Sequence, residues 1–368
     1  MKKFIFIIIT IFTILVASYQ KVSAQVKDPQ DTPFEETLEG EVVEILEEKE
    51  INDYGSLRIY QKLRIEITKG SLEGKDINVE NGKYPTANLV EYKIGDRLVI
   101  YRSKDIQGND MFLISDYVRR DALFILFLIF ALLVIFVDKA WGLTSILGMG
   151  FSFLITFKFI LPQIIRGSDP VLTAIIGSIF IILVTFYLSH GFNKKTHIAI
   201  AGTFISLIIT GVTASVFVNY SKLTGFASEE AGFLNFERQG SINMKGLLLA
   251  GIIIGTLGVL DDVTVSQSAI VYQLRSVNRR LRLKQLYKKA MNVGHDHVSS
   301  MVNTLVLVYT GAAMPLLLLF VNNPRPISEV INYEIIADEI VRTLVGSIGL
   351  VLAVPITTFL AAFIITRK

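Results

Sequence analysis

The sequence predicts an α-helical protein that crosses a membrane about seven times and carries a small, exported all-β domain at its N-terminal end. Hydrophobic residues make up 51% of the 368-residue chain, and apolar runs long enough to cross a bilayer recur through its second two-thirds. The region before them is polar, with short alternating runs that are typical of strands. A protein of this composition is expected in a membrane rather than in solution.

Charge and cysteine content exclude several classes of partner and site. The formal net charge is only +3, and no segment interleaves basic with aromatic residues, so we expect no nucleic-acid partner. The chain contains no cysteine, which rules out disulfides and thiolate metal ligands. We expect no cofactor.

Residues 1–24 have the pattern of a secretory signal. Lys2 and Lys3 precede an apolar run from Phe4 to Ala17, and small residues stand just before Gln25. A basic start, a short apolar stretch and a small-residue cleavage site together predict a signal peptide. An uncleaved anchor is the alternative, and both interpretations export the residues that follow.

Residues 25–120 are predicted to form a small β-barrel or sandwich, similar to an oligomer-binding fold. Leu63, Ile65 and Ile67 alternate with charged residues, which is the pattern of a half-buried strand. Further strand-like runs are separated by Gly or Asn turns, so that the expected strands cover residues 40–46, 61–67, 76–79 and 96–101. The charges in this region are scattered singly, which favours a solvated strand face over a catalytic site.

Residues 121–368 form the predicted membrane domain. Its expected spans are residues 122–138, 141–161, 170–189, 198–218, 246–270, 298–320 and 341–365. Cytoplasmic loops are enriched in Lys and Arg, and the loops at residues 138–140, 190–197 and 275–297 carry most of these cations. The C-terminus is therefore expected in the cytoplasm and the β domain outside.

The fifth span carries two adjacent acids, Asp261 and Asp262. A charged side chain at the centre of a bilayer costs at least ~2.5–3.5 kcal/mol, so such a residue needs a sheltered or hydrated position. As one helix, residues 246–274 would extend ~43 Å, against a hydrocarbon core of ~30 Å. The span therefore either tilts and projects into the cytoplasm or breaks near residues 258–264, as in transporters with discontinuous helices.

On helical spacing, Gly251, Gly255 and Gly258 share one face of the fifth span with Asp262 and Ser266. Small residues allow close approach of a neighbouring helix, so this face is expected to pack against another span. Asp261 points elsewhere, near Thr264, and Gln267 adds a third polar group in this region. The alternative interpretation is ordinary packing by the glycines, with Asp262 as the cap of a cytoplasmic helix.

The sixth span begins with the sequence GHDH, which contains His295, Asp296 and His297. These side chains could hold a metal ion, but Asp296 is also a good residue to cap the start of a helix, and we favour the cap. Farther along, polar and small residues form a stripe that includes Asn303 and Thr304 and extends to Gly311. If the stripe packs on the glycine face of the fifth span, Asp262 gains amide and hydroxyl partners.

The chain resembles the YibE/F family of multi-pass bacterial membrane proteins. The residues that carry this resemblance are GTLGVLDDVTVSQS at positions 255–268, GHDHVSSMVNTL at 294–305 and YTGA at 309–312. Residues 93–96 and 116–120 are similar to the N-terminal half of that family. The resemblance implies a permease-like protein in the bacterial plasma membrane.

These observations lead to three functional hypotheses. The leading hypothesis is a permease, and not an enzyme, that moves a small solute or ion past the polar groups of the fifth and sixth spans within the bilayer. The alternatives are a membrane-anchored sensor or assembly protein with a ligand-binding β domain, and an intramembrane hydrolase, for which Asp138 is the only second acid available. Both a monomer and a homo-oligomer are compatible with the sequence. The expected binding residues are Asp261, Asp262, Thr264, Ser266, Gln267, Asn303 and Thr304.

Overall fold

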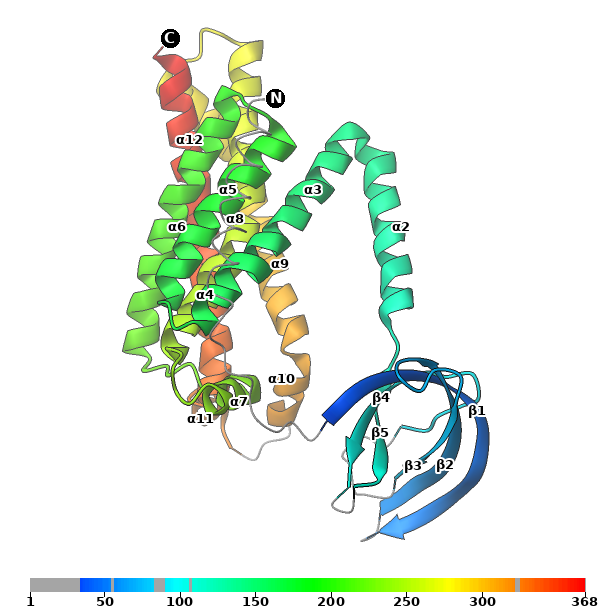
Figure 1. The fold of residues 1–368 in the computed structure, drawn as a ribbon. Helices are drawn as coiled ribbons and strands as arrows, with labels where there is room; N and C mark the ends of the chain where they lie inside the picture. The colour runs from blue at the N-terminus through cyan, green and yellow to red at the C-terminus, as the bar shows by residue number, and fades with distance from the viewer. Residues whose placement is uncertain (1–33, 54–55, 83–89, 106–107, 322–324, 368) are drawn as a thin grey trace. The chain divides into compact units, whose positions relative to one another are not determined.

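A computed structural model describes residues 34–53, 56–82, 90–105, 108–321 and 325–367, and the predicted signal over residues 1–24 lies outside these ranges. The described residues divide into two compact units that meet in the sequence at Leu133 and Val134. The first unit contains five β-strands and the second a bundle of helices (Figure 1).

The first unit is a single antiparallel sheet with the strand order β3-β2-β1-β4-β5. Strands β1 to β3 follow one another as neighbours, and β4 returns to pair with the other edge of β1, which is a Greek-key arrangement. The edge strands β3 and β5 contact each other, as in a small, partly open barrel, which is one of the two forms, barrel or sandwich, that the sequence predicts. The strands are β1 (Phe34–Asp53), β2 (Ser56–Lys69), β3 (Asp76–Asn81), β4 (Arg97–Lys104) and β5 (Asp110–Tyr117).

The core of this sheet is filled by apolar side chains that alternate with exposed residues along the strands. Leu63, Ile65 and Ile67 of β2 are buried while the residues between them are exposed, because successive side chains of a strand point to opposite faces. Gly40 in β1 lets the strands approach closely, since a Cβ there would lie 2.5 Å from the Ile65 side chain. The pairing of β1 with β2 also shifts register at several points, and such bulges bend a strand.

Gln61 joins the core of the sheet to the segment before β4. Its side chain is fully buried; Nε2 donates to the Tyr92 carbonyl oxygen at 2.9 Å, and Oε1 accepts from the Tyr92 backbone N–H at 2.8 Å. We expect Gln61→Met to lower the free energy of unfolding by ~1–3 kcal/mol, because it leaves both backbone groups without partners. Faster amide hydrogen exchange at Tyr92 in the variant would verify this role, and unchanged exchange would contradict it.

The described residues contain six helices that are long and apolar enough to cross a membrane, or up to seven spans if α9 and α10, bent by 72°, count as one. The first of the six, Arg120–Asp138, begins within the sheet unit, which extends to Leu133. This architecture, with a small N-terminal antiparallel sheet, confirms the predicted fold class in outline. The helices are α2 (Arg120–Asp138), α3 (Ala140–Ile155), the π-helical turn η1 (Thr156–Ile160), α4 (Leu161–Ile165), α5 (Pro170–His190), α6 (Lys194–Tyr220), α7 (Glu229–Glu237), α8 (Met244–Val277), α9 (Leu283–Ala312), α10 (Met314–Val321), α11 (Ile327–Val330) and α12 (Glu334–Thr366).

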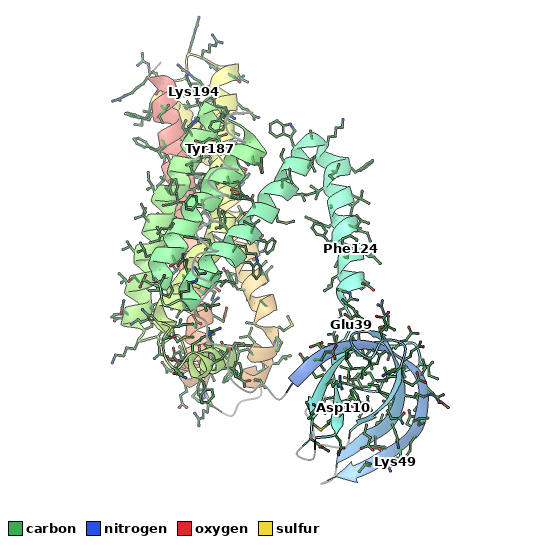
Figure 2. The ribbon with its side chains drawn as sticks, viewed as in Figure 1. Glu39, Lys49, Asp110, Phe124, Tyr187 and Lys194 are labelled. Atoms are coloured by element: carbon green, nitrogen blue, oxygen red, sulfur yellow. The ribbon has the colours of Figure 1, made fainter. Side chains whose placement is uncertain are left out.

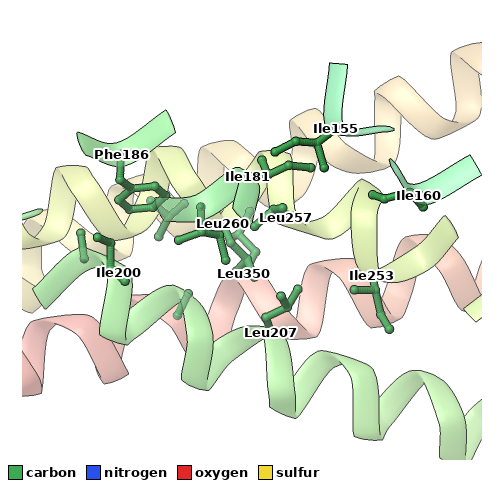
Figure 3. Packing of buried hydrophobic residues seen from close by; sticks show 14 of the residues in the cluster. Ile155, Ile160, Ile181, Phe186, Ile200, Leu207, Ile253, Leu257, Leu260 and Leu350 are labelled. Carbon is green, nitrogen blue, oxygen red and sulfur yellow. The ribbon is translucent and has the colours of Figure 1, made fainter. Parts of the chain in front are cut away.

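Helices α5, α6, α8 and α12 form the centre of the bundle (Figure 1). Apolar side chains such as Phe186, Leu260 and Leu350 fill the space between them (Figure 3). Where helices cross closely, glycine faces a threonine: a Cβ at Gly202 of α6 would lie 2.2 Å from Thr357 Oγ1 of α12. Small residues of this kind allow backbones to approach within a membrane bundle.

Candidate functional site

Helix α8 passes through the middle of the bundle and carries the two adjacent acids. It is a single helix of 34 residues, about 51 Å long at 1.5 Å per residue. Of the two alternatives that the sequence left open, the structure therefore has the continuous helix and not the break near residues 258–264. Contacts with α5, α6, α9 and α12 surround it. Gly255, Gly258 and the β-branched residues that follow have weak helix propensity. The helix remains continuous through them because it packs against several neighbouring helices.

The two carboxylates of α8 have different surroundings. Asp261 is half-buried, and its Oδ1 atom is buried without a hydrogen-bond partner among the residues that the structure describes. Asp262 is exposed on the neighbouring face of the helix. A buried carboxylate oxygen that accepts no hydrogen bond is costly unless a cation, a proton or water compensates it.

The inward face of α8 carries a seam of buried hydroxyl and amide groups. Thr264 Oγ1 lies 2.7 Å from Thr203 Oγ1 of α6, and Gln267 Oε1 accepts a hydrogen bond from Thr358 Oγ1 of α12 at 3.0 Å. All four side chains are fully buried. Gln267 Nε2, in contrast, finds no partner within the described ranges. Two predicted site residues, Thr264 and Gln267, therefore hold α8 to α6 and α12, and Ser266 is half-buried beside them.

The glycine face of α8 does not pack as the sequence predicts. At Gly251 and Gly258, no described atom outside the local backbone lies within 4 Å of the position that a Cβ would occupy. At Gly255 the nearest atom is the Tyr309 hydroxyl oxygen of α9, at 3.6 Å. These glycines and Asp262 are all exposed, so they form an open face of small residues beside the acids.

The polar stripe on α9 also lies away from its predicted position. Asn303, Thr304 and Gly311 are exposed, and Thr304 Oγ1 donates to the carbonyl oxygen of Ser300 in its own helix at 3.0 Å. The face of α9 that packs on the bundle instead consists of apolar and small residues spaced three or four positions apart, namely Ala290, Gly294, Val298, Met301, Val302, Leu305 and Tyr309. The expected contact between this stripe and Asp262 is therefore not formed.

The sequence GHDH does not start a helix. Helix α9 begins at Leu283, where Gln285 Oε1 accepts a hydrogen bond from the Arg282 backbone N–H. Asp296 therefore lies in the helix interior and cannot cap its start, which corrects the sequence prediction. His295 and Asp296 are exposed and His297 is half-buried. No group of three His, Asp or Glu side chains suited to a metal ion occurs among the residues placed by the structure.

A cavity of about 400 Å³ lies at the turn between α5 and α6. Tyr187 and Lys194, labelled in Figure 2, belong to the two helices that this turn joins. Asn193 shapes this turn: its Oδ1 accepts from the Thr196 backbone N–H at 3.1 Å, and its Nδ2 donates to the His190 carbonyl oxygen at 2.7 Å. The cavity is lined by Asp138, Trp141, Ser145, Ser189, His190, Asn193, Lys195, Thr196, Ala199, Val265 and Ala269. It thus presents one carboxylate, one imidazole and one ammonium group.

Helix α8 carries both the acids and two of the residues that line the cavity. Val265 and Ala269 line it, and residues three and seven positions apart on a helix share a face, so Asp262 lies on that face one turn farther along. Sequence reasoning missed His190 and Lys195, which it treated as loop residues, because no local spacing indicates that the α5–α6 turn meets α2, α3 and α8 there.

Comparisons with known proteins place most of the helical unit in one family. Residues 126–367 match the model of a family described as YibE/F-like protein. Neither the curated proteins nor the solved structures contain a significant match to this chain.

Proposed function

The chain belongs to the YibE/F-like protein family, and on that premise we propose that it is a permease that moves a small solute or ion through a polar site within the membrane. The site consists of Asp261 and Asp262 with the hydroxyl and amide groups of Thr264, Ser266 and Gln267. Its entrance is the cavity beside His190. Asn303 and Thr304 are left out of this site because no hydrogen bond joins either of them to the acids among the described residues, and Thr304 bonds to its own helix instead.

The buried Oδ1 atom of Asp261 is the observation that carries this proposal. It lies near the middle of an apolar helix, without a hydrogen-bond partner in the described part of the chain. A permanently ionised carboxylate in that position would weaken the fold. A cation or proton that binds there and leaves again would compensate the charge for part of a transport cycle, and intramembrane acids commonly serve transport in this way.

The cavity at the α5–α6 turn supplies a route to this acid. Asp138 and Lys195 present charges of both signs on its wall, so it can hold water and a hydrated ion. Asp262 lies between the cavity and Asp261 along α8. Cation or proton coupling is therefore the form of transport that we propose, with Asp262 as the first carboxylate reached from the cavity.

The proposed orientation places this cavity on the cytoplasmic side of the bacterial plasma membrane. The cations of residues 275–289 and the C-terminal Arg367 support that side, because cytoplasmic segments are enriched in Lys and Arg. The β unit then lies outside. Its Greek-key sheet resembles folds that bind oligomeric ligands, which favours a sensor or assembly protein as the second candidate function.

Blocking the cavity tests the proposed route. We expect Ala269→Trp to lower ion flux into proteoliposomes by more than about tenfold, because Ala269 lines the cavity and the indole would fill it. A barrier increase of only ~1.4 kcal/mol is enough for that loss. Flux of protons, Na⁺ and K⁺ would be followed with ion-sensitive dyes inside liposomes that contain the full-length protein.

The control is Ala312→Trp, which adds the same side chain at an exposed position of α9 outside the cavity. Equal flux in both variants would contradict the proposed route. A wild-type protein that moves none of these ions would contradict cation transport and favour the sensor alternative.

A further inference from the structure

The turn between α8 and α9 and the first residues of α9 concentrate positive charge. Residues 263–295 contain no Asp or Glu. The cations in this stretch are Arg275, Arg279, Arg280, Arg282, Lys284, Lys288 and Lys289. The turn lies at the same end of the bundle as the C-terminus (Figure 1), and Leu281 and Leu286 belong to one apolar cluster with Ala361 and Ala362 of α12. Packing therefore fixes the part of the chain that presents these cations.

Three lysines of α9 point away from the bundle. Lys284 and Lys288 lie one turn apart on the face opposite Leu286 and Ala290, which are fully buried. Both lysines and the neighbouring Lys289 are exposed, and within the described part of the chain none of the three forms an ion pair or a side-chain hydrogen bond. A lysine in the first turn of a helix opposes the helix dipole. The formation of α9 therefore does not require this charge.

The contacts of α8 set the depth of these lysines in a bilayer. The apolar run of α8 begins at Leu247, and a hydrocarbon core of ~30 Å takes ~20 helical residues to cross, so the core ends near Gln267. On α9 the same depth is that of Gly294, because Gln267 Nε2 lies 3.0 Å from the position of a Cβ there. Lys288 and Lys289 precede Gly294 by five or six residues, or ~8–9 Å along the helix. A headgroup region of ~5–8 Å beyond the core therefore lies within reach of both ammonium groups.

We propose that Lys284, Lys288 and Lys289 bind the anionic headgroups of phospholipids in the leaflet on this side of the membrane. The phosphate charge complements the ammonium groups, and the long lysine stem lets each of them reach the headgroup level. Arg279 and Arg280 stand farther out, because α8 continues for ten residues, ~15 Å, beyond the hydrocarbon core before the turn. They therefore contribute less to lipid binding. The binding is independent of the transport proposed above, so a protein that moves no ion would leave it unaffected.

The test is a binding titration of the purified full-length protein in detergent with phosphatidylglycerol and phosphatidylcholine that carry the same fluorescent acyl chain. The ratio of the two dissociation constants reports the preference for the anionic headgroup. We expect Lys288→Gln with Lys289→Gln to lower this preference by about fivefold or more, because each cation near a bilayer surface attracts anionic lipid. Arg279→Gln with Arg280→Gln removes the same charge at the tip of the turn and should lower it by less than about twofold.

Two further variants separate local charge from structure and from net charge. Lys288→Arg with Lys289→Arg keeps the charge and should retain the wild-type preference. Lys75→Gln with Lys93→Gln removes two exposed cations of the sheet unit and should also retain it.

The proposal is overturned if the wild type binds both lipids equally, or if the glutamine variant at Lys288 and Lys289 keeps the wild-type preference. An equal loss in the sheet variant would overturn it as well, because net charge alone would then explain the preference. If the variant at Arg279 and Arg280 loses more than the lysine variant, the attraction is centred at the tip of the turn. That result would replace the lipid by a soluble acidic partner.

Discussion

Asp261→Asn and Asp262→Asn are each expected to lower ion flux through proteoliposomes by more than about tenfold while the protein remains folded. Asparagine keeps the size of the side chain but can neither bind a proton reversibly nor attract a cation as a carboxylate does. A charge-assisted interaction contributes ~1.5–3 kcal/mol, and losing ~1.4 kcal/mol from the rate-limiting step already lowers a rate tenfold. The measurement is the initial rate of dye-reported ion flux at equal protein content.

Asp296→Asn is the matched control, because it makes the same substitution at an exposed position of α9. It should transport like the wild type. Unchanged flux in both the Asp261 and the Asp262 variants would remove the acids from the transport site. Thermal unfolding of each variant separates loss of transport from loss of fold.

Gly349→Val is expected to lower the apparent melting temperature of the full-length protein by several degrees. A Cβ at Gly349 of α12 would lie 2.0 Å from Thr210 Oγ1 and 3.2 Å from Thr210 Cβ of α6. Thr210 is fully buried and donates to the Ser206 carbonyl oxygen at 2.8 Å, so it has little room to move. Overpacking of this kind costs ~1–3 kcal/mol, which corresponds to about 2–4 °C per kcal/mol in a domain of comparable size.

Gly258→Val provides the comparison. It introduces the same helix propensity change, but no described atom outside the local backbone lies within 4 Å of a Cβ at this position. We therefore expect its melting temperature to stay above that of Gly349→Val by several degrees. Equal melting temperatures would show that the contact between α6 and α12 does not require glycine.

The sequence predicts where helices and strands lie along the chain better than it predicts which side of each helix packs against its neighbours. A span needs only a long apolar run, so the expected spans agree closely with α2, α5, α6, α8 and α12. Four of the five strands were also expected. Strand β5 was missed because its apolar residues, such as Met111 and Leu113, remain exposed and give a weak alternating signal.

The arrangement of the candidate site follows from the sequence only within a single helix. Spacing along α8 correctly places Asp261 and Asp262 on different faces, because helix geometry fixes the directions of both side chains. It cannot reveal which face of α9 meets α8 and α12, since that depends on the packing of Gly294: a Cβ there would lie 2.7 Å from a methyl group of Val354 in α12 and 3.0 Å from Gln267 Nε2 in α8. That contact turns Ala290 and Leu305 inward and leaves Asn303 outside.

Two threonine hydroxyl groups in the buried seam of hydroxyl and amide groups each have two possible hydrogen-bond acceptors. Thr203 has a single proton and two oxygen neighbours, the Ala199 carbonyl at 3.0 Å and Thr264 Oγ1 at 2.7 Å. Thr358 likewise can donate to Val354 at 2.6 Å or to Gln267 at 3.0 Å. Each donor therefore has an acceptor on its own backbone that would remain available if α8 were displaced relative to its neighbours. Relative movement of these helices therefore carries a smaller enthalpic penalty than it would if every bond joined two helices.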